Sequence, residues 1–313
     1  MLPTEKREKI HDLSKEIILL YGEPKIGKSS LAAQFPDALF LSTEKGLNHL
    51  EVFEQPIKDW KSLLATITAL CNEKNNFKTI VIDTTDNLAL YCQDHVLKEN
   101  GADHESELGF GRGWKLVDKE FRKAVDKLSR LSNKGMIFIS HSIAVPEVRK
   151  GTAEGKTKIS HTLSPKMRKV IHGMADMIWY METDFDGNRV IRTKGTRDYD
   201  AGDRSNLLPP TIQMGKSANE GYRNILGFYY GGENGQAREV LTKRIFNGIT
   251  HLAENKIDGF ENANRVDNSV KKHLGDKDHE VTLKTYKDDK DIPIEKLELY
   301  VRHLLSKNNG GKK

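Results

Sequence analysis

A phosphate-binding loop lies near the start of the chain. Four apolar residues, Ile17 to Leu20, run into the pattern G-x-x-x-x-G-K-S, and residues compatible with a helix follow it. Glycines at both ends of the pattern let backbone N–H groups approach phosphate oxygens without a Cβ in the way. Lys28 supplies positive charge to the β- and γ-phosphates, and Ser29 offers a hydroxyl to Mg²⁺. The residues predicted to hold the nucleotide are Gly22, Glu23, Pro24, Lys25, Ile26, Gly27, Lys28, Ser29 and Ser30.

Two acidic residues follow apolar stretches further along the chain. Asp83 ends a strongly apolar strand, and open α/β sheets bind ligands at the carboxyl ends of their strands, so Asp83 and Ser29 are predicted to hold Mg²⁺. Hydrolysis also needs a group that activates water, but Thr84 stands where many ring-forming ATPases carry a glutamate after the Asp. Glu44 follows the second apolar strand and would lie beside the loop if the two strands are neighbours. Glu44 is therefore the predicted base, with a solvated loop glutamate as the alternative.

A basic segment follows the fourth apolar strand. His141 ends that strand, where such sheets carry a polar residue that senses the γ-phosphate, although a lone histidine is equally often structural. Residues 143–169 hold seven Lys and Arg against two Glu. We expect 143–160 to form a long mobile loop that contacts single-stranded DNA through Arg149, Lys150, Lys156 and Lys158. A solvated surface loop is the alternative, because the segment has no aromatic residue on which bases could stack.

Strands and helices alternate in the part of the chain that must position these residues. Apolar runs predict buried strands at 38–42, 78–83 and 136–140, and apolar residues at helical spacing predict helices at 60–71 and 114–131. This alternation predicts an α/β fold with a parallel sheet covered by helices on both faces. Beyond it we expect a helix opened by Ser164-Pro165, a hairpin of 177–182 with 189–193, and a last strand at 225–230.

The predicted organisation has three parts: a polar lead-in at 1–15, the α/β domain at 16–232, and a small helical module at 233–313. Helical spacing of apolar residues predicts three helices in that module, near 240–252, 266–274 and 294–305.

Composition limits the class of protein. The chain has 313 residues, 37% hydrophobic and 30% charged, with a net charge of +5 that permits a polyanion partner without requiring one. The two cysteines, Cys71 and Cys92, have no metal-site spacing and are expected to be free thiols. The charged first residues exclude an apolar signal peptide, and no run approaches 18 apolar residues, so we expect a cytoplasmic protein with no membrane partner.

Several motifs together resemble the phage-encoded RecA-like ATPases, which are relatives of RecA and RadA implicated in single-strand annealing and recombination. The motifs are G-E-P-K-I-G-K-S-S, L-F-L-S-T-E-K-G-L, T-I-V-I-D-T, G-F-G-R-G-W, I-F-I-S-H-S, A-D-M-I-W-Y and Y-D-A-G-D-R-S-N-L-L-P. The resemblance implies a RecA-like P-loop NTPase core that binds ATP and Mg²⁺ through Lys28, Ser29 and Asp83, with Glu44 as catalytic base. Many relatives have Lys before the late Asp-Arg pair where this chain has Gly202, which leaves Arg204 as the candidate to reach a neighbouring subunit's nucleotide. Salt bridging within the fold is the alternative for Arg204.

The function favoured by the sequence is a DNA-dependent ATPase of phage recombination, annealing or replication. It would be a homo-oligomer with nucleotide at the subunit interface. One alternative is a nucleotide-gated adaptor or loader that recruits a partner, such as a phage or host single-strand-binding or annealing protein, through its C-terminal module. Another is a P-loop kinase or GTPase, but Asn133-Lys134 is followed by Gly135-Met136 and does not complete the guanine motif N-K-x-D.

Overall fold

The computed structural model describes most of the chain. The described residues are 12–109, 111–131, 134–147, 156–231, 236–275, 280–287, 292, 296–297, 299–301, 303–304 and 307. The chain divides into two compact units, Asp12–Tyr222 on the one hand and Met1–His11 with Arg223–Lys313 on the other. The predicted limits of 1–15, 16–232 and 233–313 stay a prediction, and the observed division falls inside a helix.

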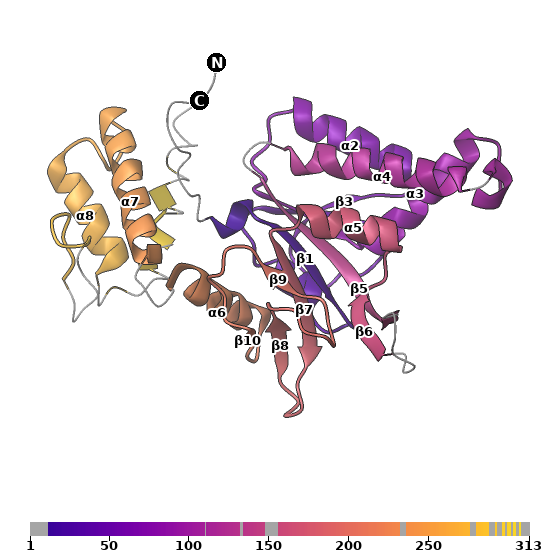
Figure 1. Ribbon diagram of the computed structural model, residues 1–313. Helices are drawn as coiled ribbons and strands as arrows, with labels where there is room; N and C mark the ends of the chain where they lie inside the picture. The colour runs from indigo at the N-terminus through magenta and orange to yellow at the C-terminus, as the bar shows by residue number, and fades with distance from the viewer. Residues whose placement is uncertain are drawn as a thin grey trace, which may run out of the picture. The chain divides into compact units, whose positions relative to one another are not determined.

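A mostly parallel sheet forms the centre of the first unit (Figure 1). The strands run in the order β10-β8-β7-β1-β5-β4-β2-β3, with β6 paired to β5 and β9 paired to β7. Five pairings, β1–β5, β1–β7, β4–β5, β2–β4 and β2–β3, are parallel, and the hairpins are antiparallel. The bounds are β1 Ile17–Gly22, β2 Ala38–Ser42, β3 Phe53–Pro56, β4 Thr79–Asp83, β5 Gly135–Glu147, β6 Lys156–His161, β7 Met177–Thr183, β8 Arg189–Arg192, β9 Gly202–Asp203 and β10 Thr211–Gln213.

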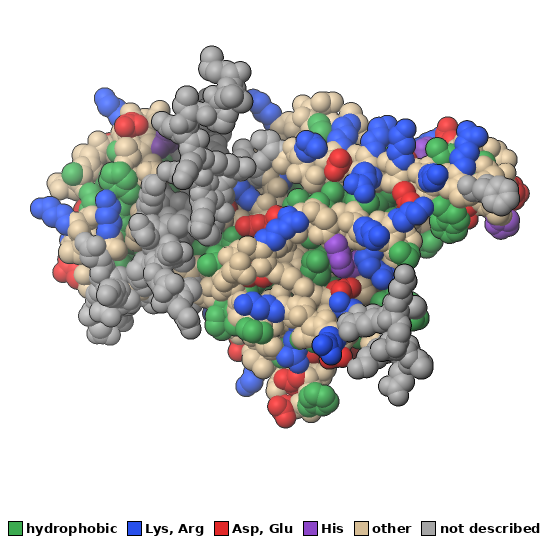
Figure 2. Space-filling model, viewed as in Figure 1, with side chains coloured by type: hydrophobic (Ala, Val, Ile, Leu, Met, Phe, Trp, Pro, Cys, Tyr) green, Lys and Arg blue, Asp and Glu red, His purple; other side chains and the backbone are tan. Residues whose placement is uncertain are grey.

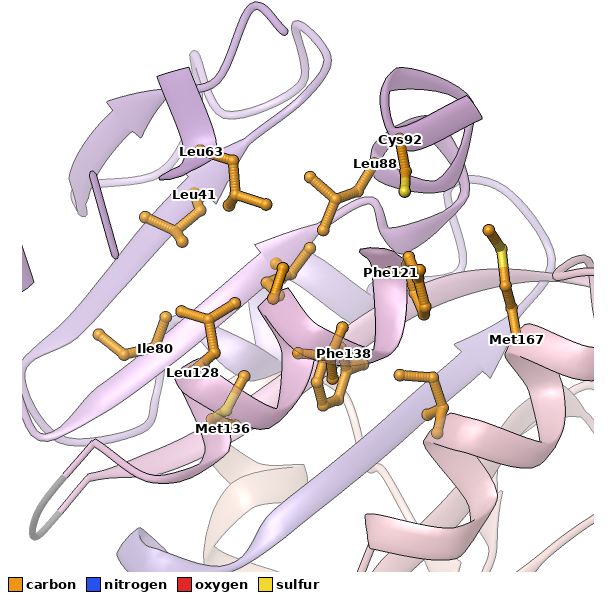
Figure 3. Packing of buried hydrophobic residues seen from close by; sticks show 14 of the residues in the cluster. Leu41, Leu63, Ile80, Leu88, Cys92, Phe121, Leu128, Met136, Phe138 and Met167 are labelled. Atoms are coloured by element: carbon orange, nitrogen blue, oxygen red, sulfur yellow. The ribbon is translucent and has the colours of Figure 1, made fainter. Parts of the chain in front are cut away.

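Four helices cover one face of this sheet: α2 Trp60–Asn72, α3 Thr85–Glu99, α4 Arg112–Ser129 and α5 Pro165–Met174 (Figure 1). Their apolar stripes meet alternate side chains of the strands, and Phe121 of α4 and Phe138 of β5 are fully buried in the shared core (Figure 3). On the opposite face, Phe35, which follows α1 (Lys28–Ala32), packs against Trp179 of β7 and Tyr222 of α6 (Ala218–Gly231). The predicted α/β fold with helices on both faces is confirmed.

The segment expected to be a mobile loop at 143–160 is instead a β-hairpin, so that expectation is wrong. β5 continues past His141 to Glu147 and pairs antiparallel with β6, from Ser142 opposite His161 to Glu147 opposite Lys156. The hairpin projects beyond the sheet, so Ile143, Ala144 and Pro146 are exposed and no buried face imposes apolar alternation on the sequence. Residues 148–155 lie outside the described residues.

Other differences concern short or ambiguous apolar patterns. The strand expected at 225–230 is wrong, because these residues lie in α6, where Tyr222, Ile225, Leu226 and Tyr229 are buried at helical spacing. Helix α3 and the short exposed strand β3 were not predicted. The sequence predicts the positions of strands β1, β2, β4, β7 and β8 and of helices α2, α4 and α5. Ser164 is the N-cap of α5, and Pro165 is the first residue of that helix.

The second unit is helical. It contains α7 Gln236–Glu254 and α8 Ala263–Leu274, and its buried side chains include Ile245, Ile249, Val266 and Val270. Of the third predicted helix, Leu297, Tyr300, Val301 and Leu304 are helical and buried, whereas Ile294 and Leu305 lie outside the described residues. Across the described part of the chain, no helix has the length and apolar character needed to cross a membrane. Both cysteines are free thiols, as predicted.

Candidate nucleotide-binding site

The phosphate loop connects the end of β1 to the start of α1, as its motif predicts. The two motif glycines are required for different reasons. Gly27 has φ 111°, in the region that side chains disfavour. A Cβ on Gly22 would lie 2.2 Å from the carbonyl oxygen of Met181 on β7, so this glycine allows close contact between neighbouring strands. The conformation of the loop therefore depends on the close contact of Gly22 with β7 and on the backbone conformation of Gly27.

The Lys28 side chain folds back along the loop. Its Nζ donates hydrogen bonds to the carbonyl oxygens of Gly22, at 2.9 Å, and Glu23, at 2.7 Å. Burial lowers the pKa of Lys28, while the nearby carboxylates of Asp83 and Glu44 favour its charged form. The Lys28 ammonium group thus lies where the motif predicts phosphate oxygens. Phosphate oxygens would accept stronger hydrogen bonds from Lys28 than these neutral carbonyl oxygens do.

Ser29 and Asp83 meet below the loop, as predicted. The Ser29 hydroxyl donates to Oδ2 of Asp83 at 2.6 Å, and Asp83 is buried at the carboxyl end of β4. Burial is the main cause that raises the pKa of Asp83, and the Ser29 hydrogen bond opposes it. A hydroxyl and a carboxylate are the hard oxygen donors that Mg²⁺ prefers, so the residues fit the ion. Within the described residues no group of three or more His, Cys, Asp and Glu could hold a metal.

Glu44 lies near this pair, but not for the reason that the sequence suggested. Strands β5 and β4 lie between β1 and β2, so the assumption that β1 and β2 are neighbours is wrong. Glu44 is exposed, its charge acts on both Lys28 and Asp83, and its Oε2 accepts a hydrogen bond from Nδ2 of Asn87 at 3.2 Å. The carboxylate is thus held at the same edge of the sheet as the loop, in contact with solvent.

His141 lies on β5 directly beside the start of the loop, because it is the register partner of Gly22. Its backbone N–H donates to Oδ2 of Asp86 at 3.0 Å. The buried Nδ1 has no hydrogen-bond partner among the described residues, and the ring lies close enough to Asp83 to oppose slightly the rise that burial causes in the pKa of that carboxyl. The histidine ring therefore lies near the predicted metal carboxylate.

Arg204 lies at the opposite edge of the sheet from its own phosphate loop. Its guanidinium contacts Oδ1 of Asp176 at 3.2 Å and the carbonyl oxygen of Gly173 at 2.8 Å. Oδ2 of the same Asp176 accepts a hydrogen bond from the backbone N–H of Ile17, which begins β1. Within its own chain, Arg204 is thus a salt-bridging residue remote from the loop.

The predicted DNA contacts are only partly described. Arg149 and Lys150 lie outside the described residues, and the side chain of Lys156 does too, although its backbone begins β6. Lys158 forms an ion pair with Asp200, with Nζ 2.7 Å from Oδ1, so this cation is partly neutralised within the fold.

Sequence reasoning missed three residues at this edge. Asp86 and Asn87 stand in the first turn of α3, a helix that was not predicted, and they hold His141 and Glu44. Arg189 begins β8, and a Cβ on Gly27 would lie 3.1 Å from its Nη1. The hairpin of β7 and β8 was predicted, but the signal for Arg189 was absent because the sequence does not reveal that β7 pairs with β1.

Comparison with known proteins identifies the family. A family model described as "AAA domain" matches residues 14–205, which is more than half of the chain and spans the loop, Glu44, Asp83 and His141. This chain belongs to the AAA domain family. Its AAA domain therefore carries a P-loop of the ATP-binding type, with a site that fits Mg²⁺ at Ser29 and Asp83.

Two individual proteins are similar to parts of this AAA protein. The SPbeta prophage-derived uncharacterized protein YorG of Bacillus subtilis (strain 168) is 28% identical over 137 residues, which are 42% of this chain and 42% of YorG. The chain thus matches less than half the length of that relative. A crystal structure of the RadB recombinase aligns with a TM-score of 0.39 and 14% identity over 66% of this chain and 90% of RadB.

Proposed function

We propose that this protein is a Mg²⁺-dependent ATPase whose turnover is stimulated by single-stranded DNA, acting in phage DNA recombination, annealing or replication. The observation that carries the ATPase part is the contact of 2.6 Å between the Ser29 hydroxyl and the Asp83 carboxylate directly below the phosphate loop. Together with the AAA family match, this contact favours ATP hydrolysis over simple anion binding.

Each residue of the site has its own proposed role in hydrolysis. The loop N–H groups and Lys28 would bind the phosphates and offset the negative charge that grows in the transition state. Mg²⁺, when bound at Ser29 and Asp83, would neutralise charge on the β- and γ-phosphates. Glu44 is exposed and held by Asn87, so it can accept a proton from a water molecule at the open side of the site. His141, beside the start of the loop, would contact the γ-phosphate or the attacking water through its ring.

Two observations support DNA as the activator. Strand β5, which carries His141, continues directly into the basic hairpin. A ligand that moves the hairpin would therefore also move His141. Lys and Arg side chains also gather over α4 (Figure 2). The exposed cations of this helix form no ion pair within the described part of the chain: Arg112, Lys115, Lys119, Arg122, Lys123 and Lys127. Unneutralised cations of this kind fit a phosphate backbone.

The proposals of a phage setting and of partners rest on the similarity to YorG and on the sequence motifs. YorG is prophage-derived, and the sequence motifs resemble RecA-like ATPases of phage recombination. We therefore propose a homo-oligomer in which Arg204 exchanges its Asp176 contact for the nucleotide of the next subunit. A single-strand-binding or annealing protein is the proposed partner of the C-terminal module.

ATP turnover measured with and without single-stranded DNA tests the proposal. We expect Lys28→Ala to lose nucleotide binding. We expect Glu44→Gln to bind ATP normally but to turn it over about 10²- to 10⁴-fold more slowly, as for a lost general base. Normal hydrolysis by Glu44→Gln would exclude this residue as the base, and turnover that ignores DNA would refute the DNA part. Slow turnover combined with tight partner binding would favour the adaptor instead.

A further inference from the structure

The base of the β5–β6 hairpin is held by one carboxylate, that of Asp86 on α3. Oδ1 of Asp86 accepts a hydrogen bond from the hydroxyl of Ser140 at 2.7 Å and another from the hydroxyl of Thr162. Oδ2 accepts from the backbone N–H of His141 at 3.0 Å. Ser140 and His141 belong to β5, and Thr162 directly follows β6, so the two oxygens hold both strands of the hairpin where they leave the sheet.

The same carboxylate lies one helical turn from the metal-site residue. Asp83 ends β4, and Asp86 stands in the first turn of α3, with no flexible segment between them. Asp83 in turn accepts the Ser29 hydroxyl of the phosphate loop. A continuous series of contacts thus leads from the loop through Asp83 and the start of α3 to both strands of the hairpin.

The hydrogen bonds within the hairpin do not make Asp86 redundant. The N–H of Thr162 donates to the carbonyl oxygen of His141 at 3.1 Å, which closes the hairpin on itself. None of these internal bonds reaches α3. Among the described residues, Asp86 supplies the side-chain hydrogen bonds that join α3 to both strands, so movement of the hairpin changes the bonds that Asp86 accepts.

We infer that Asp86 is a positioning residue that couples the hairpin to the nucleotide site. This inference rests on the proposed function, in which the hairpin contacts DNA. DNA that shifts the hairpin moves the backbone of His141 and, through Asp86, the start of α3, which begins directly after Asp83 and Thr84 in the chain. Without Asp86, nucleotide and DNA still bind, but each affects the other much less.

The test compares Asp86→Asn and Thr162→Val with Asp94→Asn as the matched control. Asp94 is an exposed carboxylate on the same helix, outside both the site and the hairpin. Asp86→Asn replaces one acceptor oxygen with a donor, and Thr162→Val removes the hydroxyl that donates to Asp86 and that also lies 3.4 Å from the Ser140 hydroxyl. The readouts are basal kcat and KM for ATP, the ratio of turnover with and without single-stranded DNA, and the change in DNA Kd caused by a non-hydrolysable ATP analogue.

We expect both Asp86→Asn and Thr162→Val to keep basal KM and DNA binding while the stimulation ratio falls about tenfold, within the usual range of coupling between sites. The effect of nucleotide on the DNA Kd should shrink as well, and the effect of DNA on the nucleotide Kd should shrink by that same factor, because coupling of binding is reciprocal. Asp94→Asn should behave as wild type. If Asp86→Asn does not fold, Thr162→Val provides the same test, since Thr162 is exposed.

Three outcomes would overturn the inference. Wild-type turnover that ignores DNA refutes the proposed function and this coupling with it. A stimulated wild type with equally stimulated Asp86→Asn and Thr162→Val variants refutes the role of Asp86 alone. Basal and stimulated turnover that fall together, with an unchanged ratio, show that Asp86 has only a structural role.

Discussion

Gly22 shows how one residue serves both the loop and the sheet. A Cβ at this position would lie 2.2 Å from the carbonyl oxygen of Met181, so Gly22→Ala must separate β1 from β7. We expect a loss of about 1–3 kcal/mol in the free energy of unfolding, as for other overpacked sites, measured by urea denaturation. Gly173→Ala on α5 is the control, because nothing lies within 4 Å of its added Cβ and alanine favours a helix. Equal stability of Gly22→Ala and wild type would contradict this packing.

The nucleotide-site residues differ in how far the sequence predicts them. The phosphate loop is predictable because its chemistry lies in consecutive residues, and Asp83 because it ends a clear apolar strand. Asp86, Asn87 and Arg189 are not predictable in this way. They reach the site through a helix that the local pattern did not reveal and through strand pairings between residues far apart in the chain.

At the scale of elements, a histidine pair joins β6 to α5. Nε2 of His161 lies 3.0 Å from Nε2 of His172, and His161 is fully buried. Burial, with smaller effects from His172 and Arg168, lowers the pKa of His161 to about 3, while Asp200 opposes the change. The contact between β6 and α5 therefore depends on an uncharged His161 ring.

This pair predicts acid sensitivity. The unfolded chain protonates His161 near its ordinary pKa of about 6.5, whereas the native chain does not, so protons favour unfolding. The stabilisation is fully present above about pH 6.5 and falls by about 2 kcal/mol by pH 5. Urea denaturation between pH 7.5 and 5 checks this. His161→Gln should flatten the slope, and His49→Gln, at an exposed position, should not. An unchanged slope in His161→Gln would disprove the prediction.

Elements with a strong apolar pattern were predicted, and elements whose pattern is weak or ambiguous were not. Strands β1, β2 and β4 and helices α2, α4 and α5 carry strong apolar patterns because the core covers them. The outer half of β5, with exposed Ile143 and Ala144, carries no such pattern, so the hairpin looked like a loop. Helix α6 lies where the sequence predicts a strand, because a short apolar run fits the period of either element.

The cations of α4 provide a second prediction at this scale. Replacing Lys115, Lys119 and Arg122 together with Glu should weaken binding of single-stranded DNA and make the plot of log K against log salt about 2 units shallower, because three phosphate contacts are lost. Lys58 and Lys74, exposed beside α2, supply a double charge-reversal control that should leave binding intact. If the α4 variant and wild type show the same salt dependence, the DNA does not bind over α4.

For the whole molecule, the division into two units predicts a separable ATPase. A chain ending at residue 232 keeps all of α6 and every residue of the nucleotide site. We expect it to bind ATP and to show DNA-stimulated turnover, with Lys28→Ala in the same shortened chain as the inactive control. Loss of nucleotide binding on truncation would contradict this independence, and loss of partner binding alone would assign that task to the C-terminal module.

Because β5 lies between β1 and β4, it also determines when the nucleotide site can fold during synthesis on the ribosome. The phosphate loop, Glu44 and Asp83 are all synthesised before Gly135, yet β5 hydrogen-bonds to both strands that carry the loop and the metal carboxylate. A nascent chain that ends before Gly135 therefore has nearly every group needed to recognise ATP, but it lacks the strand that joins β1, with the phosphate loop, to β4, with Asp83. Nucleotide can stabilise this protein only after the later half of the sheet has emerged and inserted itself between strands already made.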